Sequence, residues 1–245
     1  SALQVALAPM TDNAAPLILL TRPRPAGERF AAACRTELGE GVEILLAPLQ
    51  EIAEVGPLPV IPEDAALIFT SENGAFSYAA QGGRRGLTAY CVGDRTAEAA
   101  SAAGLEAVSA DGAVDDLRAL ILRAPEKGPL LHLHGRHVTG DLSGQLRAAG
   151  LRASGHVVYE QRDLRLSDEA RDALTGPRRV VAPGFSPRSA RLLARAAPDM
   201  RNTVLPCISA AARAALPEAL RPHGTISDRP DAAAMLIAVA RQLCP

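Results

Sequence analysis

Short apolar runs alternate with longer segments of helical periodicity along most of this chain. The run at residues 17–20 is followed by a pattern over residues 26–38 that places Phe30 and Cys34 on one helix face. Glycines at positions 39 and 41 mark the end of that helix. Strands that alternate with helices in this way predict parallel sheets in an α/β fold.

The same pattern assigns an element to most of the chain, with strands at the apolar runs and helices at the periodic segments. Strands are predicted at residues 17–20, 42–46, 66–69, 89–92, 105–108, 129–133, 157–159, 180–181 and 204–208. Helices are predicted at about residues 26–38, 73–80, 96–103, 115–123, 140–149, 168–174, 187–196, 211–220 and 232–243.

One stretch near the middle of the chain organises this arrangement. In residues 156–162, two valines and Tyr159 favour a strand, and polar residues follow. Residues 48–52 form a second extended segment, after which three prolines mark a connection. We interpret these two stretches as ties between two similar α/β domains, with Tyr159 facing the cleft between them.

The chain also repeats itself. A first kind of segment, made of a strand, a turn, a helix and a strand, occurs at residues 18–46 and again at residues 131–159. A second kind pairs residues 67–71 with 180–186, and Cys91-Val92-Gly93 with Cys207-Ile208-Ser209. The order is first, second, first, second, which predicts two doubly wound domains. These are either tandem halves or one domain inserted in the other.

Composition narrows the class of protein. Apolar residues make up 48% of the chain and aromatic residues only 3%, so the core must be aliphatic and rich in alanine. The net charge of −1 gives no global field for nucleic acid or an anionic membrane, so neither is expected as a partner. No apolar run is long enough to span a bilayer.

Four well-separated cysteines favour buried, reduced thiols over a disulfide framework. Residues 1–16 lack a charged segment followed by an apolar one, so we expect a mobile tail and not a signal peptide. These features favour a cytoplasmic protein. The cysteines are Cys34, Cys91, Cys207 and Cys244.

A string of short motifs, each weak alone, has a specific order and spacing. They are Leu20-Thr21-Arg22-Pro23, Phe69-Thr70-Ser71-Glu72-Asn73-Gly74-Ala75, Val92-Gly93-Asp94-Arg95-Thr96-Ala97, Gly135-Arg136 with Leu142, Leu146 and Gly150, Val158-Tyr159-Glu160, and Phe185-Ser186-Pro187. From Leu17 onward, the chain with these motifs resembles the uroporphyrinogen-III synthase family.

The resemblance implies the inserted arrangement: two similar doubly wound parallel-sheet domains joined by a two-stranded linker. It places one domain at residues 16–47 and 165–245 and the other at 56–155, with connectors at 48–55 and 156–164 and a tail at 1–15. Family members close the linear tetrapyrrole hydroxymethylbilane into uroporphyrinogen III, inverting the last ring and losing water, without a cofactor. Hydroxymethylbilane synthase is then an expected transient partner.

The substrate implied by the resemblance is flexible and carries eight carboxylates, so its binding is mainly a positioning task. In doubly wound sheets, ligands bind at the carboxyl ends of the strands, where helix N-termini and arginine side chains can hold carboxylates. The substrate-binding residues expected at such ends are Arg22, Thr70, Ser71, Gly93, Arg95, Thr96, Gly135, Arg136, Ser186, Arg188 and Ser209.

Tyr159 is the expected catalytic residue, because its phenol can donate a proton to the departing hydroxyl. The alternative is that Tyr159 only caps a sheet edge. Thr96, Thr70 and Ser71 are equally well explained as helix N-caps, and Arg22 and Arg136 as solvated turn residues.

Three histidines, His132, His134 and His137, invite a metal interpretation, but no cysteine or acid lies at ligand spacing, so no metal is expected. A glycine-rich dinucleotide fingerprint and a P-loop are both absent from the sequence, which counts against a dehydrogenase.

One loop departs from the family. The second-half counterpart of residues 93–96 is Ser209-Ala210-Ala211-Ala212, where family members usually carry a glycine and a threonine. Ser209 is left as the hydrogen-bond donor there. The loop keeps open an alternative from another class, a two-domain small-molecule binding or sensory protein without catalysis.

Overall fold

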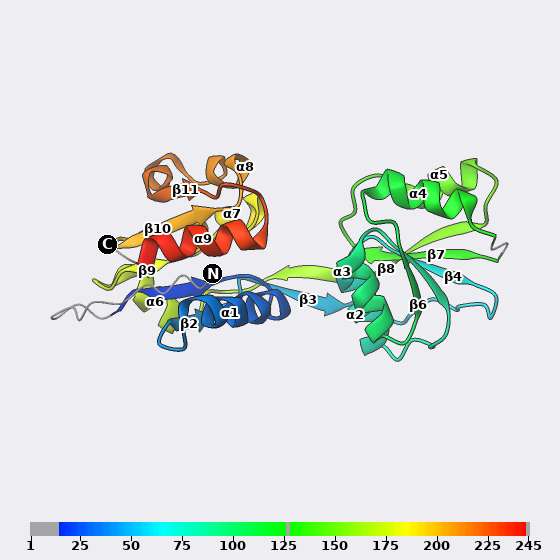
Figure 1. Ribbon diagram of the computed structural model, residues 1–245, viewed down its shortest axis with the longest axis horizontal. Coiled ribbons are helices and arrows are strands. Elements are labelled where there is room, and N and C mark those ends of the chain that lie inside the picture. Colours follow the sequence, from blue (N-terminus) through cyan, green and yellow to red (C-terminus); the bar gives the residue numbers. More distant parts are fainter. Residues whose placement is uncertain (1–14, 126–127, 244–245) are drawn as a thin grey trace. The chain divides into compact units, whose positions relative to one another are not determined.

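The computed structural model describes residues 15–125 and 128–243, which divide into two compact units (Figure 1). Unit 1 consists of the chain up to Glu51 and from Asp163 onward, and unit 2 of Ile52–Arg162. The chain therefore leaves unit 1, builds unit 2 and returns. The finer domain limits expected from the sequence stay a prediction, and almost all of the expected tail lies outside the described residues.

Unit 1 contains a five-stranded sheet in the order β11-β10-β9-β1-β2, in which neighbouring strands are parallel. Its strands are β1 (Leu17–Leu20), β2 (Glu43–Leu46), β9 (Val180–Val181), β10 (Thr203–Cys207) and β11 (Gly224–Ile226). Its helices are α1 (Arg24–Leu38), α6 (Asp168–Thr175), α7 (Pro187–Ala196), α8 (Ala210–Ala214), the 3-10 helix η1 (Glu218–His223) and α9 (Ala232–Leu243).

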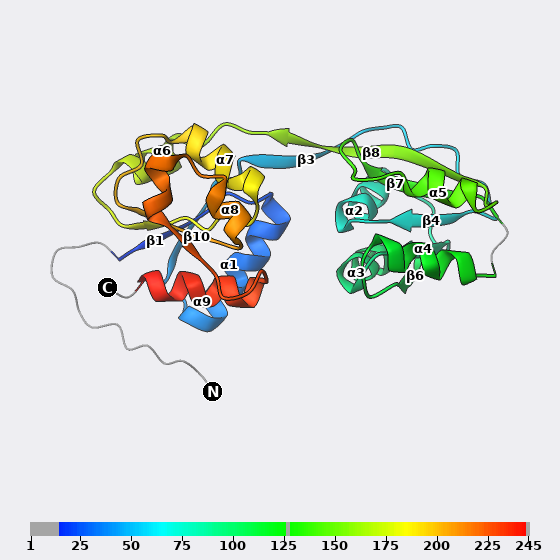
Figure 2. The ribbon, with the colours of Figure 1, turned by 90° about the horizontal axis from the view of Figure 1, so that it is seen from above.

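Helices cover both faces of this sheet because successive strand side chains point to opposite sides. Leu17 and Leu19 of β1 belong to a core shared with α6, α7 and α8. Ile18 and Leu20 pack on the other side, against α1 and α9. Figure 2 shows α1 and α9 on one side of the strands and α6, α7 and α8 on the other. Unit 1 is thus doubly wound.

Unit 2 contains a six-stranded sheet in the order β3-β8-β7-β4-β5-β6. The pairs from β8 to β6 are parallel. Its strands are β3 (Gln50–Glu54), which starts in unit 1, β4 (Ala66–Phe69), β5 (Thr88–Cys91), β6 (Glu106–Ser109), β7 (Leu130–Gly135) and β8 (Ala153–Asp163). Its helices are α2 (Glu72–Ala80), α3 (Asp94–Ala102), α4 (Val114–Arg123) and α5 (Leu142–Ala148).

The same alternation gives unit 2 two cores. Leu67 and Phe69 of β4 pack with α2 and α3, while Ala66 and Ile68 pack with α4 and α5. The order β8-β7-β4-β5-β6 repeats the order β2-β1-β9-β10-β11 of unit 1. The predicted α/β class with parallel sheets is confirmed, and each pair of repeated segments occupies the same place in its own sheet.

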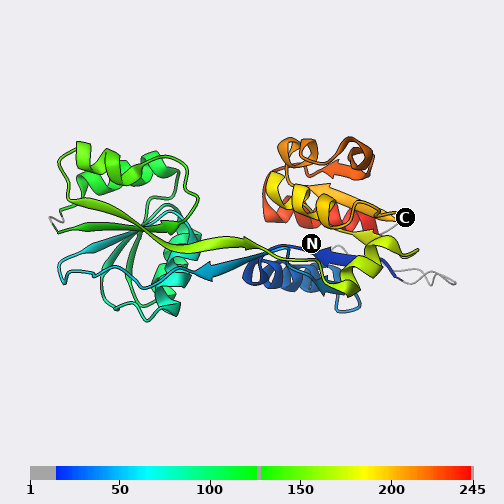
Figure 3. The ribbon, with the colours of Figure 1, turned by 180° about the vertical axis from the view of Figure 1, so that it is seen from behind.

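Strands β3 and β8 connect the two units and are hydrogen-bonded to each other (Figure 3). Val55 N donates to Val158 O at 2.8 Å, and Leu164 N donates to Leu49 O at 2.8 Å. Residue numbers rise along one strand as they fall along the other, so the two strands run antiparallel. β8 extends well beyond the three-residue strand that the sequence predicts at 157–159.

Two predictions about the last third of the chain were wrong. The helix expected at residues 211–220 ends at Ala214, and a separate 3-10 helix begins at Glu218. Pro217 lies between them with φ −54° and ψ 151°. This extended backbone conformation cannot continue a helix. The short strand β11 was missed because Gly224-Thr225-Ile226 is too short for a recognisable pattern.

Candidate functional site

In unit 2, three neighbouring parallel strands end at one edge of the sheet. β4 ends at Phe69, β5 at Cys91 and β7 at Gly135, and the turns that follow carry most of the predicted site residues. Parallel strands present their carboxyl ends together, so these turns form one edge. This edge of unit 2 is one part of the candidate site that the sequence predicts, and the other expected residues lie at strand ends of unit 1.

Thr70 and Ser71 follow β4 and play different parts. Ser71 is the N-cap of α2, and its Oγ accepts a hydrogen bond from Asn73 N at 3.2 Å. Thr70 is not the cap: its Oγ1 lies 3.0 Å from His132 Nε2 on β7. The N-cap explanation therefore holds for Ser71 and is wrong for Thr70, whose hydroxyl is held by a side chain from the next strand.

The turn after β5 begins helix α3. Gly93 is the N-cap and Asp94 the first helical residue, so Thr96 lies inside the first turn and is 6% exposed. The N-cap explanation for Thr96 is thus wrong, because the helix starts three residues earlier than its hydroxyl would require. Arg95 is exposed and has no hydrogen bond or ion pair with any described residue. Its guanidinium is available to an anion.

Tyr159, within β8, packs against Gly135, the last residue of β7. The Tyr159 ring is only 9% exposed and belongs to the core under α2 and α3. A Cβ placed on Gly135 would lie 2.7 Å from two carbons of that ring, so only glycine fits there. The Tyr159 hydroxyl has no hydrogen-bond partner among the residues that the structure describes. Gly135 therefore has a packing role, and the phenol keeps a free donor.

Glu160 on β8 binds two arginines. Arg136 Nε donates to Glu160 Oε2 at 2.7 Å, and Arg162 Nε donates to Oε1 at 2.7 Å. The hydrogen bonds from Arg162 and Arg136 lower the pKa of Glu160. Arg136 is thus in an ion pair and not simply a solvated turn residue, and an incoming carboxylate must compete with Glu160 for it.

Histidines gather beside this edge. His132 is 3% exposed, and burial together with the nearby His134 lowers its pKa to about 4. The ring centroids of His132 and His134 are 4.7 Å apart, as their shared strand face predicts. His156 Nε2 lies 2.8 Å from Ser154 Oγ, and burial lowers its pKa as well. No group of three potential metal ligands is found in residues 15–125 and 128–243.

In unit 1, the turn after β1 carries Arg22. Its Cζ lies 3.9 Å from the centroid of the Phe185 ring, a cation–π contact with the turn that follows β9. Phe185 in turn packs edge-on against Phe30 of α1, with centroids 4.8 Å apart. This contact, together with the packing of Phe185 on Phe30, holds the Arg22 guanidinium at the carboxyl end of β1.

The other unit 1 candidates follow β9 and β10. Ser186 caps α7, accepting from Ser189 N at 3.0 Å, and Ser209 caps α8, accepting from Ala212 N at 3.2 Å. Arg188 Nη2 donates to Asp163 Oδ1 at 2.8 Å. Like Arg136 in unit 2, Arg188 is paired with a carboxylate from the β8 connector.

The helices that begin at these edges differ in charge. The first turns of α1, α7 and α8 in unit 1 contain no acidic residue, whereas α2 begins with Glu72 and α3 with Asp94 in unit 2. A carboxylate in the first turn occupies the positive end of the helix dipole. The N-termini of α1, α7 and α8 are therefore more open to an anionic ligand than those of α2 and α3.

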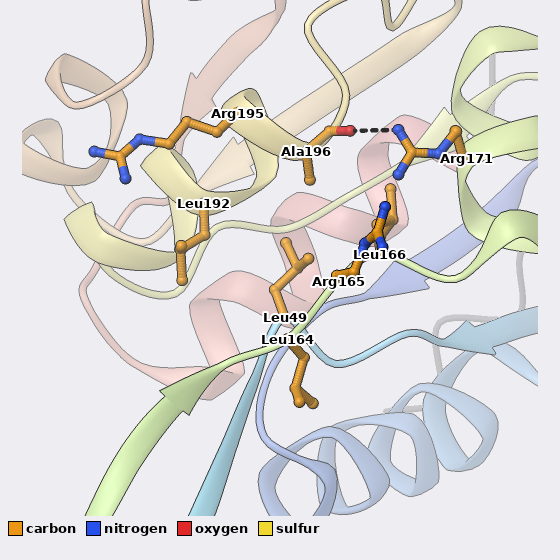
Figure 4. A pocket seen from close by; sticks show the side chains of 8 residues that line it. All are labelled: Leu49, Leu164, Arg165, Leu166, Arg171, Leu192, Arg195 and Ala196. Atoms are coloured by element: carbon orange, nitrogen blue, oxygen red, sulfur yellow. Dashed lines mark hydrogen bonds between the residues drawn. The ribbon is translucent and has the colours of Figure 1, made fainter.

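A cavity of about 300 Å³ lies elsewhere in unit 1 (Figure 4). Arginines line it together with leucines, and Arg171 Nη1 donates to the carbonyl oxygen of Ala196 at 3.1 Å. None of the predicted site residues lines this cavity. Its lining residues are Leu49, Leu164, Arg165, Leu166, Arg171, Leu192, Arg195 and Ala196.

The cysteines show no sign of a catalytic thiol, and the described helices show no membrane span. Cys34, Cys91 and Cys207 are buried free thiols, which confirms the prediction for these three, and Cys244 lies outside the described residues. Burial raises their pKa values to about 12, 12 and 11, so they are poor nucleophiles. Within the described chain, no helix is both long enough and apolar enough to cross a membrane.

Three residues that shape these edges were not among those expected from the sequence. Glu160 and Asp163 hold arginines, and Phe185 supports Arg22. Glu160 and Phe185 lie within the motifs already singled out, so their positions carried a signal, but Arg136 lies 24 residues from Glu160 and Arg22 lies much further from Phe185 in sequence. Pairing at that separation follows from strand order and not from local pattern.

Comparison with known proteins identifies the family to which the chain belongs. The family model described as uroporphyrinogen-III synthase HemD matches residues 29–237. No curated protein matches the chain. Among solved structures, it is similar to uroporphyrinogen-III synthetase from Helicobacter pylori at 18% identity and a TM-score of 0.62, covering 92% of this chain and 99% of that one.

A second similar structure is a mutant uroporphyrinogen III synthase from Thermus thermophilus, at 18% identity and a TM-score of 0.44, covering 94% of this chain and 99% of that one. The Helicobacter pylori likeness shows a shared fold. The family model spans well over half of the 245 residues. The chain therefore belongs to the uroporphyrinogen-III synthase family.

Proposed function

We propose that this protein closes hydroxymethylbilane into uroporphyrinogen III, inverting the last ring and releasing water, as a lyase that needs no cofactor. The match of the family model over residues 29–237 is the observation that carries this proposal. The family's reaction belongs to tetrapyrrole biosynthesis, and the chain is an enzyme of that route. No observation on the structure favours the non-catalytic alternative.

Charge at the carboxyl ends of the strands supports a substrate with many carboxylates. Arg95 is unpaired among the described residues, and the contact with the Phe185 ring holds the Arg22 guanidinium at the end of β1. Arg136 and Arg188 are held by Glu160 and by an aspartate of the connector, and substrate carboxylates can replace those partners. The starts of α1, α7 and α8, which lack acidic residues, add backbone donors.

Tyr159 is the proton donor in this proposal. Loss of the substrate hydroxyl needs a proton, and the phenol is the candidate donor without a hydrogen-bond partner among the described residues. The remaining task is to fold the linear chain so that the substituted carbon of the last pyrrole attacks first, which is positioning. Thr70, Ser71, Thr96, Ser186 and Ser209 are the proposed hydroxyl contacts, with Gly93 and Gly135 allowing close approach.

The proposal includes the organisation implied by the family. The domains are residues 16–47 with 165–245, and 56–155, with connectors at 48–55 and 156–164. The location is cytoplasmic. Because hydroxymethylbilane also closes spontaneously to the uninverted isomer, direct transfer from hydroxymethylbilane synthase during a transient contact would protect it.

Product analysis tests the proposal. The protein is incubated with hydroxymethylbilane generated freshly by hydroxymethylbilane synthase, and the oxidised products are resolved into isomers I and III. Isomer III is expected as the main product, without added metal or cofactor and after dialysis against a chelator. Isomer I as the sole product would contradict the enzymatic function. It would favour the alternative of a non-catalytic binding protein.

A further inference from the structure

A buried histidine stands behind one of the proposed substrate contacts. His132 lies on β7, is 3% exposed, and its Nε2 is 3.0 Å from Thr70 Oγ1. Ile68 is the partner of His132 in the β4–β7 ladder, and Thr70 follows two residues later on the same strand path. The Thr70 hydroxyl contacts the imidazole, and Thr70 is half-buried, so the residue is partly accessible at the edge where ligand is proposed to bind.

The fold does not require this polar pair. β1 holds the same place in the sheet of unit 1 as β7 in unit 2, and its four residues Leu17–Leu20 are all aliphatic and buried. Burying an imidazole costs free energy, and a single hydrogen bond does no more than offset that cost. Replacing both members of such a pair with apolar side chains of similar shape changes stability by about zero. Stability alone therefore gives no reason for His132, and its contact with Thr70 does.

The imidazole can hold the threonine hydroxyl in one of two ways. If Nε2 carries the proton, it donates to Thr70 Oγ1, and the threonine proton is left to donate to a ligand. If Nδ1 carries the proton, Thr70 must donate to Nε2 and presents only lone pairs. A carboxylate is acceptor-only when ionised, so it binds the first arrangement and is repelled by the second.

We propose that His132, with its proton on Nε2, is a positioning residue that holds the Thr70 hydroxyl as a hydrogen-bond donor to a carboxylate of the substrate. This inference rests on the proposed function and names a contact within it. The low pKa of about 4, caused by burial and by His134, keeps the imidazole neutral near pH 7. Asp141, which caps α5, acts in the opposite direction on that pKa but does not overcome burial.

The tautomer is measured without any activity assay. The full chain is labelled with ¹⁵N-histidine, and long-range ¹H–¹⁵N correlation at pH 7 locates the proton of each ring, with His132→Gln used to assign the signal. A neutral ring with the proton on Nε2 is expected. A proton on Nδ1 would overturn the proposal while leaving the enzymatic function intact.

Kinetics then tests the role. Thr70→Val is expected to raise KM for hydroxymethylbilane about tenfold, and His132→Leu about fivefold with little change in kcat, because a hydrogen bond to a charged group is weakened. His132→Gln, whose amide reaches the same place as Nε2–H, is expected to return KM to within about twofold of the parent. In the Thr70→Val background, His132→Leu should have no further effect.

The control is His223→Leu, since His223 Nδ1 bonds the carbonyl oxygen of Thr203 at the amino end of β10. Its KM should not change. An unchanged KM in His132→Leu, or an equal rise in both Thr70 backgrounds, would mean that His132 acts on the fold and not through Thr70. If His132→Leu does not fold, His132→Gln and the tautomer decide. Absence of isomer III from the parent protein would instead refute the proposed function.

Discussion

The two units build the same order of strands with different side chains at the same places. In unit 1, β1 is a run of four buried aliphatic residues, Leu17–Leu20. In unit 2, β7 occupies that place and carries His132 and His134 among its leucines. Four of the five histidines of the chain lie in unit 2, and His223 alone in unit 1. The aliphatic β1 shows that this place in the sheet needs no polar residue. We therefore interpret the histidines of β7 as functional.

The carboxyl-end edges of the two sheets also differ in the side chains that they present. At its candidate edge, unit 1 supplies the acid-free starts of α1, α7 and α8 and an arginine stacked on Phe185. Unit 2 supplies hydroxyl groups, those of Tyr159, Thr70 and Ser71, beside helix starts that carry acids. We expect a division of labour in which unit 1 binds carboxylates through Arg22 and its acid-free helix starts, and unit 2 adds a proton donor and directed hydrogen bonds to the carboxylate contacts of its own arginines. The following predictions test that division, beginning with the largest effect.

Tyr159→Phe should lower turnover by about 10²–10⁴-fold, because a positioned proton donor typically contributes that much. The ring is kept, so packing against Gly135 and the melting temperature should hardly change. Steady-state kinetics with isomer analysis gives the measurement. Thr96→Ala, Thr70→Ala and Ser71→Ala should each cost less.

The control for this change is Tyr78→Phe in the same core. The Tyr78 hydroxyl donates to Arg84 O at 2.6 Å, so its loss should reduce stability and leave turnover unchanged. Full activity in Tyr159→Phe would show that Tyr159 is not the proton donor. Unit 2 would then not have the proton-donating role proposed for it.

Acid should destabilise unit 2 through His132. Its folded pKa of about 4 lies below the unfolded value of 6.5, so the unfolded chain binds the extra proton. The stability is fully present above about pH 6.5 and is lost as pH falls toward 4, with a limit of about 3 kcal/mol. Burial lowers the pKa of His156 too, which adds in the same direction.

Hydrogen exchange of the two units between pH 7 and pH 4 measures this effect. Amides of unit 2 should lose protection as pH falls, after correction for intrinsic exchange, more than those of unit 1. His132→Leu should flatten the dependence. Equal losses in both units would show that histidine burial does not distinguish them.

Gly135→Ala should displace the Tyr159 ring, since the added Cβ would lie 2.7 Å from ring carbons. Overpacking of this kind costs about 1–3 kcal/mol of stability, and a shifted phenol should lower turnover as well. Gly41→Ala in unit 1 is the matched change, because no atom lies within 4 Å of its Cβ position. Thermal melts and kinetics of the pair check the difference; similar behaviour of both variants would contradict the close packing.

The smallest effect concerns the acidic helix starts of unit 2. Glu72→Gln and Asp94→Asn should each lower KM by about twofold to fivefold, because a charge at a helix N-terminus is worth about 0.3–1 kcal/mol. Glu37→Gln, near the end of α1 in unit 1, should leave KM as it is. Low ionic strength should enlarge the effect. A rise in KM would mean that these acids help to hold the substrate.

The sequence by itself determined the class of fold and most of its elements. Apolar runs and helical periodicity are local properties, and they survive in the structure because buried parallel strands and amphipathic helices need them. The repeat of two kinds of segment gave the doubled sheet. The motifs gave the strand ends that carry the candidate site, including Thr70, Gly135 and Tyr159.

The tertiary structure decided the partners of those residues. Thr70 faces His132, Arg136 faces Glu160 and Arg188 faces Asp163, and the members of these pairs are 62, 24 and 25 positions apart in sequence. Such contacts depend on which strands become neighbours, and periodicity contains no information on that. The same reason explains the smaller errors. Pro217 ended a helix that alanine propensity favoured, and β11 formed because an ordered β10 offered it an edge.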